Sequence, residues 1–456
     1  MRSFRIPMLL ALSTAVLAAP PLTAQVPVRP PTPKAATDST AADTTERTAA
    51  DTTDSTAKAT DSTAKATDST ANAPDSAGVD STAAKATDST ATLERPPEPP
   101  EPAARWRTSW FPYLSGGAND SPVLSFRLRH WQAADYEARS TYTAAFNADA
   151  GIAPKGSRYV SATFKAPEFW QGWRLALQAT AERQARLGYF GLGNDTQFDK
   201  NASTDEMPFP YRMRRTRYRV LAEVTRQIKG PLHVALLTGY TRARFTALPG
   251  PSVFKADFPS GDFTQHDVSG RLALIYDTRD NEYNTHQGLL LEAGTQAGSG
   301  GNGYTRQYAI LRGYLQVREG SVLAARLAGA GMGGTSSLDA RFTLPGWEKE
   351  IPVLGGQYSH RSLDTGRLAG RHVLFGNLEV RHDLIAFGDL GAITLIGFVD
   401  AGRVFQGENF RLTTDDLKVG GGGGVGLRIL RSTIFTFNFA GGPDGFNYSV
   451  GSGWMF

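Results

Sequence analysis

The chain has 456 residues, of which 40% are hydrophobic and none is cysteine, and its formal net charge is +4. This length allows two or three ordinary domains or one large barrel. The lack of cysteine excludes disulfide cross-links and a cysteine-linked lipid anchor, so an exported form of this chain would depend on backbone pairing for its stability.

Residues 1–24 have the pattern of a secretory signal peptide. Arg2 and Arg5 form a charged start, residues 6–18 are apolar, and residues 22–24 form a cleavage site. The apolar segment is too short to span a bilayer, and no later segment reaches the ~20 apolar residues that a spanning helix needs. A helical membrane protein is therefore excluded, whereas a β-barrel, whose strands are half polar, is not.

Residues 25–105 form a low-complexity arm, which begins and ends with proline and otherwise consists mainly of Asp, Ser, Thr and Ala. The unit DSTAKAT starts at Asp54 and again at Asp61, without any bulky apolar residue that could form a coiled coil. Such a segment cannot bury enough surface to offset its ordering entropy, so we expect a disordered periplasmic arm. Its Asp-Ser/Thr repeats are either a solvated tether, which we favour, or acceptors for O-glycosylation, and the intact mass would distinguish the two.

Charge divides at the same border. The arm holds 8 basic and 13 acidic residues, and residues 106–456 hold 38 basic and 31 acidic residues, a net charge of +7. A basic body can indicate a nucleic-acid partner. In an exported chain, inward-facing arginines in a water-filled lumen explain the charge better, so no nucleic-acid partner is expected.

From about Trp106 the sequence has the two-residue period of β-strands. Leu124, Phe126 and Leu128 alternate with polar residues, which predicts a strand with one apolar and one polar face. The same alternation recurs in the segments 215–225, 304–318 and 375–383.

Turn signals separate these segments every 10–20 residues, at Gly156, Gly172, Gly230, Gly320 and Gly388. About fifteen strands can be recognised. Because bacterial barrels have even strand numbers, sixteen is the expected count and fourteen the alternative.

A soluble sandwich and a membrane barrel predict different strands. The segments here exceed the usual five or six residues of a soluble strand, and their polar face carries arginines where a sandwich core would be apolar. Aromatic residues stand near strand ends, as in interfacial girdles. The sequence therefore predicts an all-β fold, a transmembrane antiparallel β-barrel of about sixteen strands over residues 106–456, in the outer membrane.

The end of the chain continues the alternation. We expect its apolar side to face lipid and the final strand to pair with the first, which closes the ring. A terminal aromatic on such a strand also resembles the signal for outer-membrane insertion. The residues concerned are Phe446, Tyr448, Val450, Trp454 and Phe456.

Five stretches follow one another in a recognisable order: YFGLGNDT (189–196), YDTRDNEYNTHQG (276–288), NLEVR (377–381), FVDAGRVF (398–405) and GVGLR (424–428). In this order they resemble the BamA/TamA family, also called bacterial surface antigen barrels. The family positions in the first two stretches are Gly191, Gly193, Asn194, Asp277, Arg279, Asp280 and Gly288. Thr285 replaces the usual proline of the second stretch.

The chain departs from the family in two places. Members normally carry globular POTRA domains before the barrel, where this chain has its low-complexity arm. The family's sixth loop carries V-R-G-[FY], and the matching stretch HRSLDTGRLAG (360–370) keeps Arg361 but has Ser362 in place of glycine.

The resemblance implies a role for Arg361. In the family this loop folds into the lumen and its arginine meets acidic residues on neighbouring strands, to which Glu379 and Asp400 correspond here. Partly buried charges need partners, and arginine suits bidentate pairing with carboxylates. The alternative is a solvated loop arginine with two ordinary lumen acids.

Other chemistry finds little support. The glycine run Gly420–Gly424 lacks the Lys-Ser/Thr of a phosphate loop and instead suits close backbone approach near a seam. No histidine has a metal-binding spacing, and the turn at Asp277 lacks the pattern of a calcium loop. His360 and His372 have no obvious serine and carboxylate partners. We therefore expect no metal, cofactor or catalytic activity.

These observations favour a barrel that assists insertion, assembly or translocation of outer-membrane proteins through a weak seam. The partners implied are unfolded outer-membrane protein clients, the outer-membrane lipid, and the barrel-assembly machinery for its own insertion. The alternative is a passive pore or a structural surface barrel without assembly activity.

Overall fold

The computed structural model describes residues 105–115, 123–135, 138–407, 409–430 and 433–456. The predicted signal peptide and the predicted arm, except for the arm's last residue, lie outside the described residues. Among the described residues, no helix is long and apolar enough to cross a membrane.

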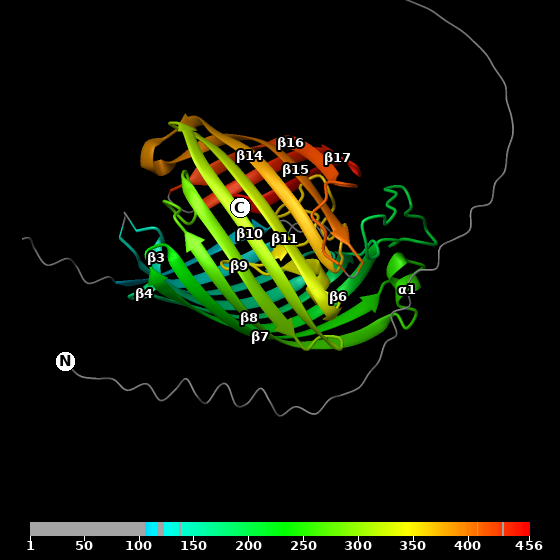
Figure 1. Cartoon of the computed structure of the whole chain (residues 1–456). Helices are drawn as coiled ribbons and strands as arrows, with labels where there is room; N and C mark the ends of the chain where they lie inside the picture. The colour runs from blue at the N-terminus through cyan, green and yellow to red at the C-terminus, as the bar shows by residue number, and fades with distance from the viewer. Residues whose placement is uncertain (1–104, 116–122, 136–137, 408, 431–432) are drawn as a thin grey trace, which may run out of the picture. The chain divides into compact units, whose positions relative to one another are not determined.

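Sixteen strands of the described chain form one antiparallel sheet, in which each strand pairs with its neighbours in chain order. This number confirms the expected count, and Figure 1 shows the sheet curling into a barrel. The strands are β1 (Trp106–Ser115), β2 (Val123–Ala133), β3 (Tyr142–Ile152), β4 (Arg158–Trp170), β5 (Trp173–Gly188), β6 (Arg212–Lys229), β7 (Leu232–Ala247), β8 (Asp262–Asp277), β9 (Gly288–Gly298), β10 (Gly303–Arg318), β11 (Ser321–Thr335), β14 (His372–Ala386), β15 (Gly391–Phe405), β16 (Lys418–Ile429), β17 (Thr433–Gly442) and β18 (Gly445–Ser452).

The remaining elements are short. The connection between β11 and β14 contains a separate two-stranded hairpin. These elements are α1 (Val253–Asp257), η1 (Asp339–Phe342), β12 (Thr343–Leu344), β13 (Ile351–Pro352) and η2 (Gly388–Leu390).

The two faces of the strands differ as the sequence predicts. On β6, Tyr218 and Val220 point outward and are 52% and 57% exposed, whereas Arg217 and Arg219 point into the barrel. This alternation places apolar side chains outside and charged side chains inside. The predicted turn glycines, including Gly172 and Gly230, adopt the positive φ angles that tight turns between strands require.

The edges of the sheet are β1 and β18. Cα atoms of these two strands approach within 8 Å, but no register joins them over the described residues. The expectation that the final strand pairs with the first is therefore wrong for the described part of the chain. Both edges present backbone donors and acceptors that the sheet itself does not satisfy.

Candidate functional site

The connection between β11 and β14, residues 336–371, folds back into the barrel, and we call it the lumen loop. Its hairpin buries Leu344 and Ile351 completely, in one cluster with Ile275 of β8 and Ile310 of β10. Burying each such side chain contributes about 1.5–3 kcal/mol. Apolar contacts therefore seat the lumen loop against the wall formed by the middle strands.

Carboxylates of the lumen loop meet arginines of β6. Asp339 Oδ1 lies 2.5 Å from Arg215 Nη1, and Asp339 Oδ2 lies 3.2 Å from Arg217 Nη1. The two terminal guanidinium nitrogens of Arg219, Nη1 and Nη2, donate to the two carboxylate oxygens of Glu350. Burial acts to raise the pKa of Asp339, but Arg217 and Arg215 lower that pKa, and the net direction is downward. Asp339 therefore stays ionised in the barrel.

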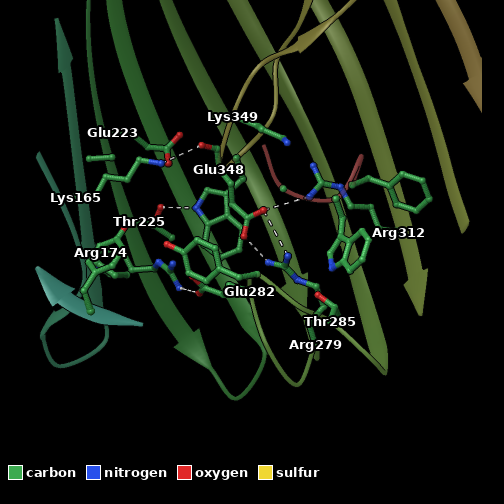
Figure 2. A pocket seen from close by; sticks show the side chains of 18 of the residues that line it. Lys165, Arg174, Glu223, Thr225, Arg279, Glu282, Thr285, Arg312, Glu348 and Lys349 are labelled. Atoms are coloured by element: carbon green, nitrogen blue, oxygen red, sulfur yellow. Dashed lines mark hydrogen bonds and ion pairs between the residues drawn. The ribbon is translucent and has the colours of Figure 1, made fainter. Parts of the chain in front are cut away.

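The tip of the lumen loop makes a second group of contacts beside a pocket of about 280 Å³. Glu348 lies 2.6 Å from Arg279 and 3.2 Å from Arg312, as Figure 2 shows. The Trp347 indole nitrogen donates to the Thr225 hydroxyl at 3.1 Å. Burial acts to raise the pKa of Glu348, whereas Arg279 and Arg312 lower it, and the net direction is again downward. The inward arginines thus face loop carboxylates here, and not only lumen water.

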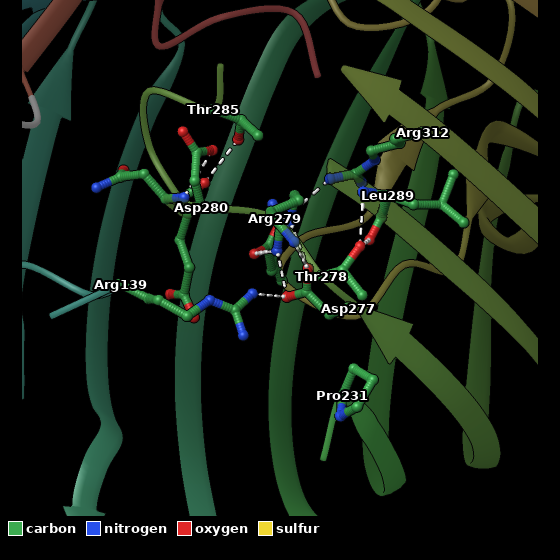
Figure 3. A network of polar contacts seen from close by, with 12 residues as sticks. Arg139, Pro231, Asp277, Thr278, Arg279, Asp280, Thr285, Leu289 and Arg312 are labelled. Atoms are coloured by element: carbon green, nitrogen blue, oxygen red, sulfur yellow. Dashed lines mark hydrogen bonds and ion pairs between the residues drawn. The ribbon is translucent and has the colours of Figure 1, made fainter. Parts of the chain in front are cut away.

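The stretch 276–288 forms the turn between β8 and β9. Asp277 accepts a hydrogen bond from Arg279 Nε at 3.0 Å and forms an ion pair with Arg139 Nη2 at 2.6 Å, so two guanidinium groups converge on one buried carboxylate (Figure 3). Asp280 accepts the backbone N–H of His286 at 3.0 Å. The motif therefore fixes the turn and, through Arg279, holds the tip of the lumen loop.

Replacing Gly288 with alanine is expected to destabilise the barrel. Gly288 has a φ of +112°, and an added Cβ would lie 2.4 Å from the Thr278 carbonyl oxygen. Strain of this kind costs roughly 1–3 kcal/mol, and the midpoint of urea unfolding would show it. The control is Gly397→Ala on β15, where an added Cβ meets nothing within 4 Å. Equal midpoints for the two variants would contradict the prediction.

Arg361 of the lumen loop lies between two strand carboxylates. Its Nε and Nη2 donate to the two Asp400 oxygens at 2.9 and 2.8 Å, and its Nη1 donates to Glu379. Its backbone N–H also donates to Asp400 at 2.9 Å, and the whole residue is 1% exposed. Arg361 is therefore buried and paired with both carboxylates, and the alternative of a solvated loop arginine is wrong. The bidentate geometry gives both strength and orientation to the loop–wall contact.

Further groups complete this cluster. Asn377 Nδ2 donates to Asp400 at 2.8 Å, and Arg381 Nε donates to Glu379 at 2.7 Å. The Arg361 guanidinium carbon stands 3.4 Å from the ring centre of Phe398. Each buried carboxylate therefore has at least two charged or polar partners.

The stretch 189–196 contacts the same loop from the other side. Gly191 and Gly193 have positive φ angles, and Asn194 Nδ2 donates to the Asp416 carbonyl at 3.0 Å. Arg367 of the lumen loop donates to the Thr196 hydroxyl at 2.6 Å and to Asp444 at 2.9 Å. This motif thus links the connection after β5 to the connections beside β16 and β18.

The final residues divide into two groups. Phe446, Tyr448 and Val450 are outward and exposed, as expected, because they lie within β18. Trp454 and Phe456 are buried, at 6% and 7% exposure, so the expectation that they face lipid is wrong. The strand ends at Ser452, and Gly453, with a φ of +85°, redirects the chain inward. The Trp454 indole then donates to Asn284 at 2.9 Å.

The lumen loop also holds the edge strand β18 from inside. Asn447 Nδ2 donates to the carbonyls of Arg361 and Leu363 at 3.2 and 3.1 Å. The Tyr358 hydroxyl donates to the Ser452 carbonyl at 3.3 Å. The strand that lacks an edge partner is therefore fixed by the loop that carries Arg361.

The glycine run of β16 makes room for this arrangement. A Cβ at Gly420 would lie 2.1 Å from Ser362 Oγ, and one at Gly422 would lie 1.9 Å from the Phe439 carbonyl oxygen. The glycines thus let Ser362, the residue that departs from the family pattern, pack directly on the wall. They also let the backbones of β16 and β17 approach closely.

The sequence reading missed the acidic half of the lumen loop. Asp339, Glu348 and Glu350 each pair with an inward arginine, and their only signal was three carboxylates within residues 339–350 of one long connection. His360 Nε2 donates to the Lys418 carbonyl and His372 Nε2 to the Gly407 carbonyl, both at 2.8 Å, so both side chains serve structural contacts. Over the described residues, no group of three His, Asp or Glu side chains could hold a metal.

The sixteen-stranded sheet with a charged loop fixed in its lumen defines the class of protein. It is an outer-membrane β-barrel with an occupied interior. The family model of the Omp85 superfamily domain matches residues 142–441, and the chain belongs to the Omp85 superfamily. This confirms the resemblance to BamA and TamA barrels that the motifs indicate.

A solved structure of BamA has a similar fold. BamA from Haemophilus ducreyi lacking POTRA domains 1–3 is 12% identical, with a TM-score of 0.51, over 77% of this chain and 70% of that chain. CdiB from Escherichia coli is 10% identical, with a TM-score of 0.46, over 75% of this chain and 61% of that chain. CdiB from Acinetobacter baumannii is 11% identical, with a TM-score of 0.43, over 77% and 65%. The chain thus spans less than two thirds of either CdiB chain. No curated protein sequence matches it.

Proposed function

We propose that this barrel assists the insertion, assembly or translocation of outer-membrane proteins through a seam between β1 and β18. The observation that supports this most is the pair of sheet edges that no register joins over the described residues. An extended chain can add to such an edge through backbone hydrogen bonds. Membership of the Omp85 superfamily and the likeness to BamA agree with this role.

The lumen loop keeps the edge strand β18 ordered. Asn447 and Ser452 of β18 are hydrogen-bonded to the loop, so the strand keeps its position although, over the described residues, no strand pairs with its outer edge. A client strand would then pair with an edge that is already ordered, which reduces the entropic cost of binding. The mechanism needs no catalytic group, nucleotide or cofactor, because backbone pairing supplies the free energy.

The same proposal assigns the surroundings of the barrel. Unfolded outer-membrane proteins would be its clients, outer-membrane lipid would surround its apolar outer face, and the barrel-assembly machinery would insert it. Export by the signal peptide of residues 1–24 would place the arm of residues 25–105 in the periplasm. Phe446, Tyr448 and Val450 would belong to the stretch that the machinery recognises before folding.

Cross-linking the seam tests the function. The chain has no cysteine, so a panel of cysteine pairs, one position in β1 and one in β18, can lock the seam without side reactions. We expect each locked variant in liposomes to lose client assembly, measured by protease protection, and to regain it on reduction. The control is Asn438→Cys with Ser449→Cys, which links the paired strands β17 and β18. Undiminished assembly by the locked seam would refute the proposal.

A static barrel is the second candidate. The dense ion pairs between the lumen loop and the wall favour it, because they resist movement of the interior. Such a protein would show no client assembly even with its seam free, which the unlocked protein in the same assay measures directly.

A further inference from the structure

The outer face of the barrel carries a groove over β1 to β6. Its volume is about 710 Å³. Exposed apolar side chains line it, among them Phe126, Ile152, Val160 and Tyr218. Phe126, Val160 and Tyr218 belong to the outward face, because their chain neighbours point inward. Tyr159 donates to Ser125 inside the barrel, and Arg217 pairs there with Glu182.

Two arginines stand in this groove. Arg158 on β4 and Arg183 on β5 are directly opposite in the register, next to the apolar side chains. Both side chains point outward, because their chain neighbours Tyr159 and Glu182 point inward and successive side chains of a strand alternate between the two faces. Directly opposed side chains have Cβ atoms about 4.5–5.5 Å apart, and like charges at that spacing are destabilising.

Neither arginine is neutralised by the protein. Over the described residues no carboxylate pairs with Arg158 or Arg183, whereas the inward arginines Arg215 and Arg217 meet Glu182 and Asp339.

The groove lies toward one particular membrane surface. Arg158 begins β4 and Arg183 is near the end of β5, which leads into the long connection 189–211. In outer-membrane barrels the longer connections face the cell exterior and the short turns face the periplasm. The two arginines therefore lie toward the outer leaflet, above the apolar belt of the barrel.

We propose that this groove binds a phosphorylated lipid of the outer leaflet. Its phosphate lies between Arg158 and Arg183, where guanidinium groups offer bidentate hydrogen bonds. Its acyl chains lie on Phe126, Val160 and Tyr218. The bound anion relieves the repulsion between the two arginines. The inference depends on the membrane location of the barrel and not on assembly activity.

Lipid binding by the purified full-length protein tests the proposal. The probe is diphosphoryl lipid A, titrated in detergent and followed by native mass spectrometry, with phosphatidylcholine as the zwitterionic comparison. We expect preferential binding of lipid A, and the double variant Arg158→Gln/Arg183→Gln should weaken it by at least about tenfold, the value of one or more charge-assisted hydrogen bonds. Phosphatidylcholine binding should not change.

The control removes one positive charge elsewhere on the outer face and is compared with each single variant, Arg158→Gln and Arg183→Gln, as well as with the double variant. Arg226 at the opposite end of β6 stacks on Trp173 at 4.9 Å, and Arg226→Gln should leave lipid A binding unchanged. Circular dichroism and heat-modifiable mobility check that each variant is folded. Equal lipid A binding by the double variant and the wild type, or equal binding of both lipids by the wild type, would overturn the proposal.

Discussion

Replacement of Arg361 by glutamate is expected to cost the barrel at least about 3–5 kcal/mol, because it leaves the buried carboxylate of Asp400 without its counter-charge and removes one of the two partners of Glu379. Glu379 and Asp400 are 1% and 0% exposed, and each is bonded to the Arg361 guanidinium. A third carboxylate at this position adds repulsion. Urea unfolding followed by heat-modifiable mobility would show a lower midpoint.

A control in the same loop separates this effect from the loss of any arginine. Arg341 donates to the Ser336 hydroxyl at 3.3 Å and, over the described residues, pairs with no carboxylate. Arg341→Glu should therefore change the midpoint little. The double variant Arg361→Met/Asp400→Asn should lose less stability than the sum of the losses in the two single variants, because both changes remove the same interaction. Equal midpoints for the glutamate variants of Arg361 and Arg341 would exclude the structural role.

Removal of the acidic contacts of the lumen loop is expected to open a conducting path. The triple variant Asp339→Asn, Glu348→Gln, Glu350→Gln keeps the shapes of the side chains but removes their charge. Wall arginines then repel one another and lose their partners in the loop, which frees the loop and lines the opening with positive charge. The affected arginines are Arg215, Arg217, Arg219, Arg279 and Arg312.

Planar-bilayer recordings measure this change. The wild type should show low, flickering conductance, and the triple variant a steady and anion-selective one, as rings of arginine produce in pores. The control removes three exposed carboxylates in the connection after β5, by Asp195→Asn, Asp205→Asn and Glu206→Gln. This control should behave as the wild type does. A triple variant that stays closed would mean that apolar contacts alone hold the loop.

Much of the sheet could be predicted from local pattern. Strand β6 alternates Arg217 and Arg219 with Tyr218 and Val220, and a two-residue period fixes which side chains share a face. Turn glycines mark strand ends, which allowed about fifteen strands to be recognised, and the even strand number of bacterial barrels then gave sixteen. The burial of Trp454 could not be predicted in this way, because its spacing continues the alternation while the backbone turns at Gly453.

The site itself depended on contacts far apart in the sequence. Asp339 and Arg215 are separated by 124 positions, and no local pattern relates them. Arg361, Glu379 and Asp400 were identified only through the family motifs, since a single arginine in a long connection looks like any solvated one. Local periodicity thus predicts the wall, whereas the choice of partners across the lumen depends on how the sheet curls.

The contacts between β18 and the lumen loop affect how this barrel keeps its shape. A fully closed barrel keeps its circumference through the backbone hydrogen bonds between its first and last strands. Here Asn447 of β18 and Arg215 of β6 both bond to the lumen loop, so contacts across the interior also hold the wall in place. Under the proposed function, a client strand added between β1 and β18 would increase the circumference and leave these contacts across the interior intact.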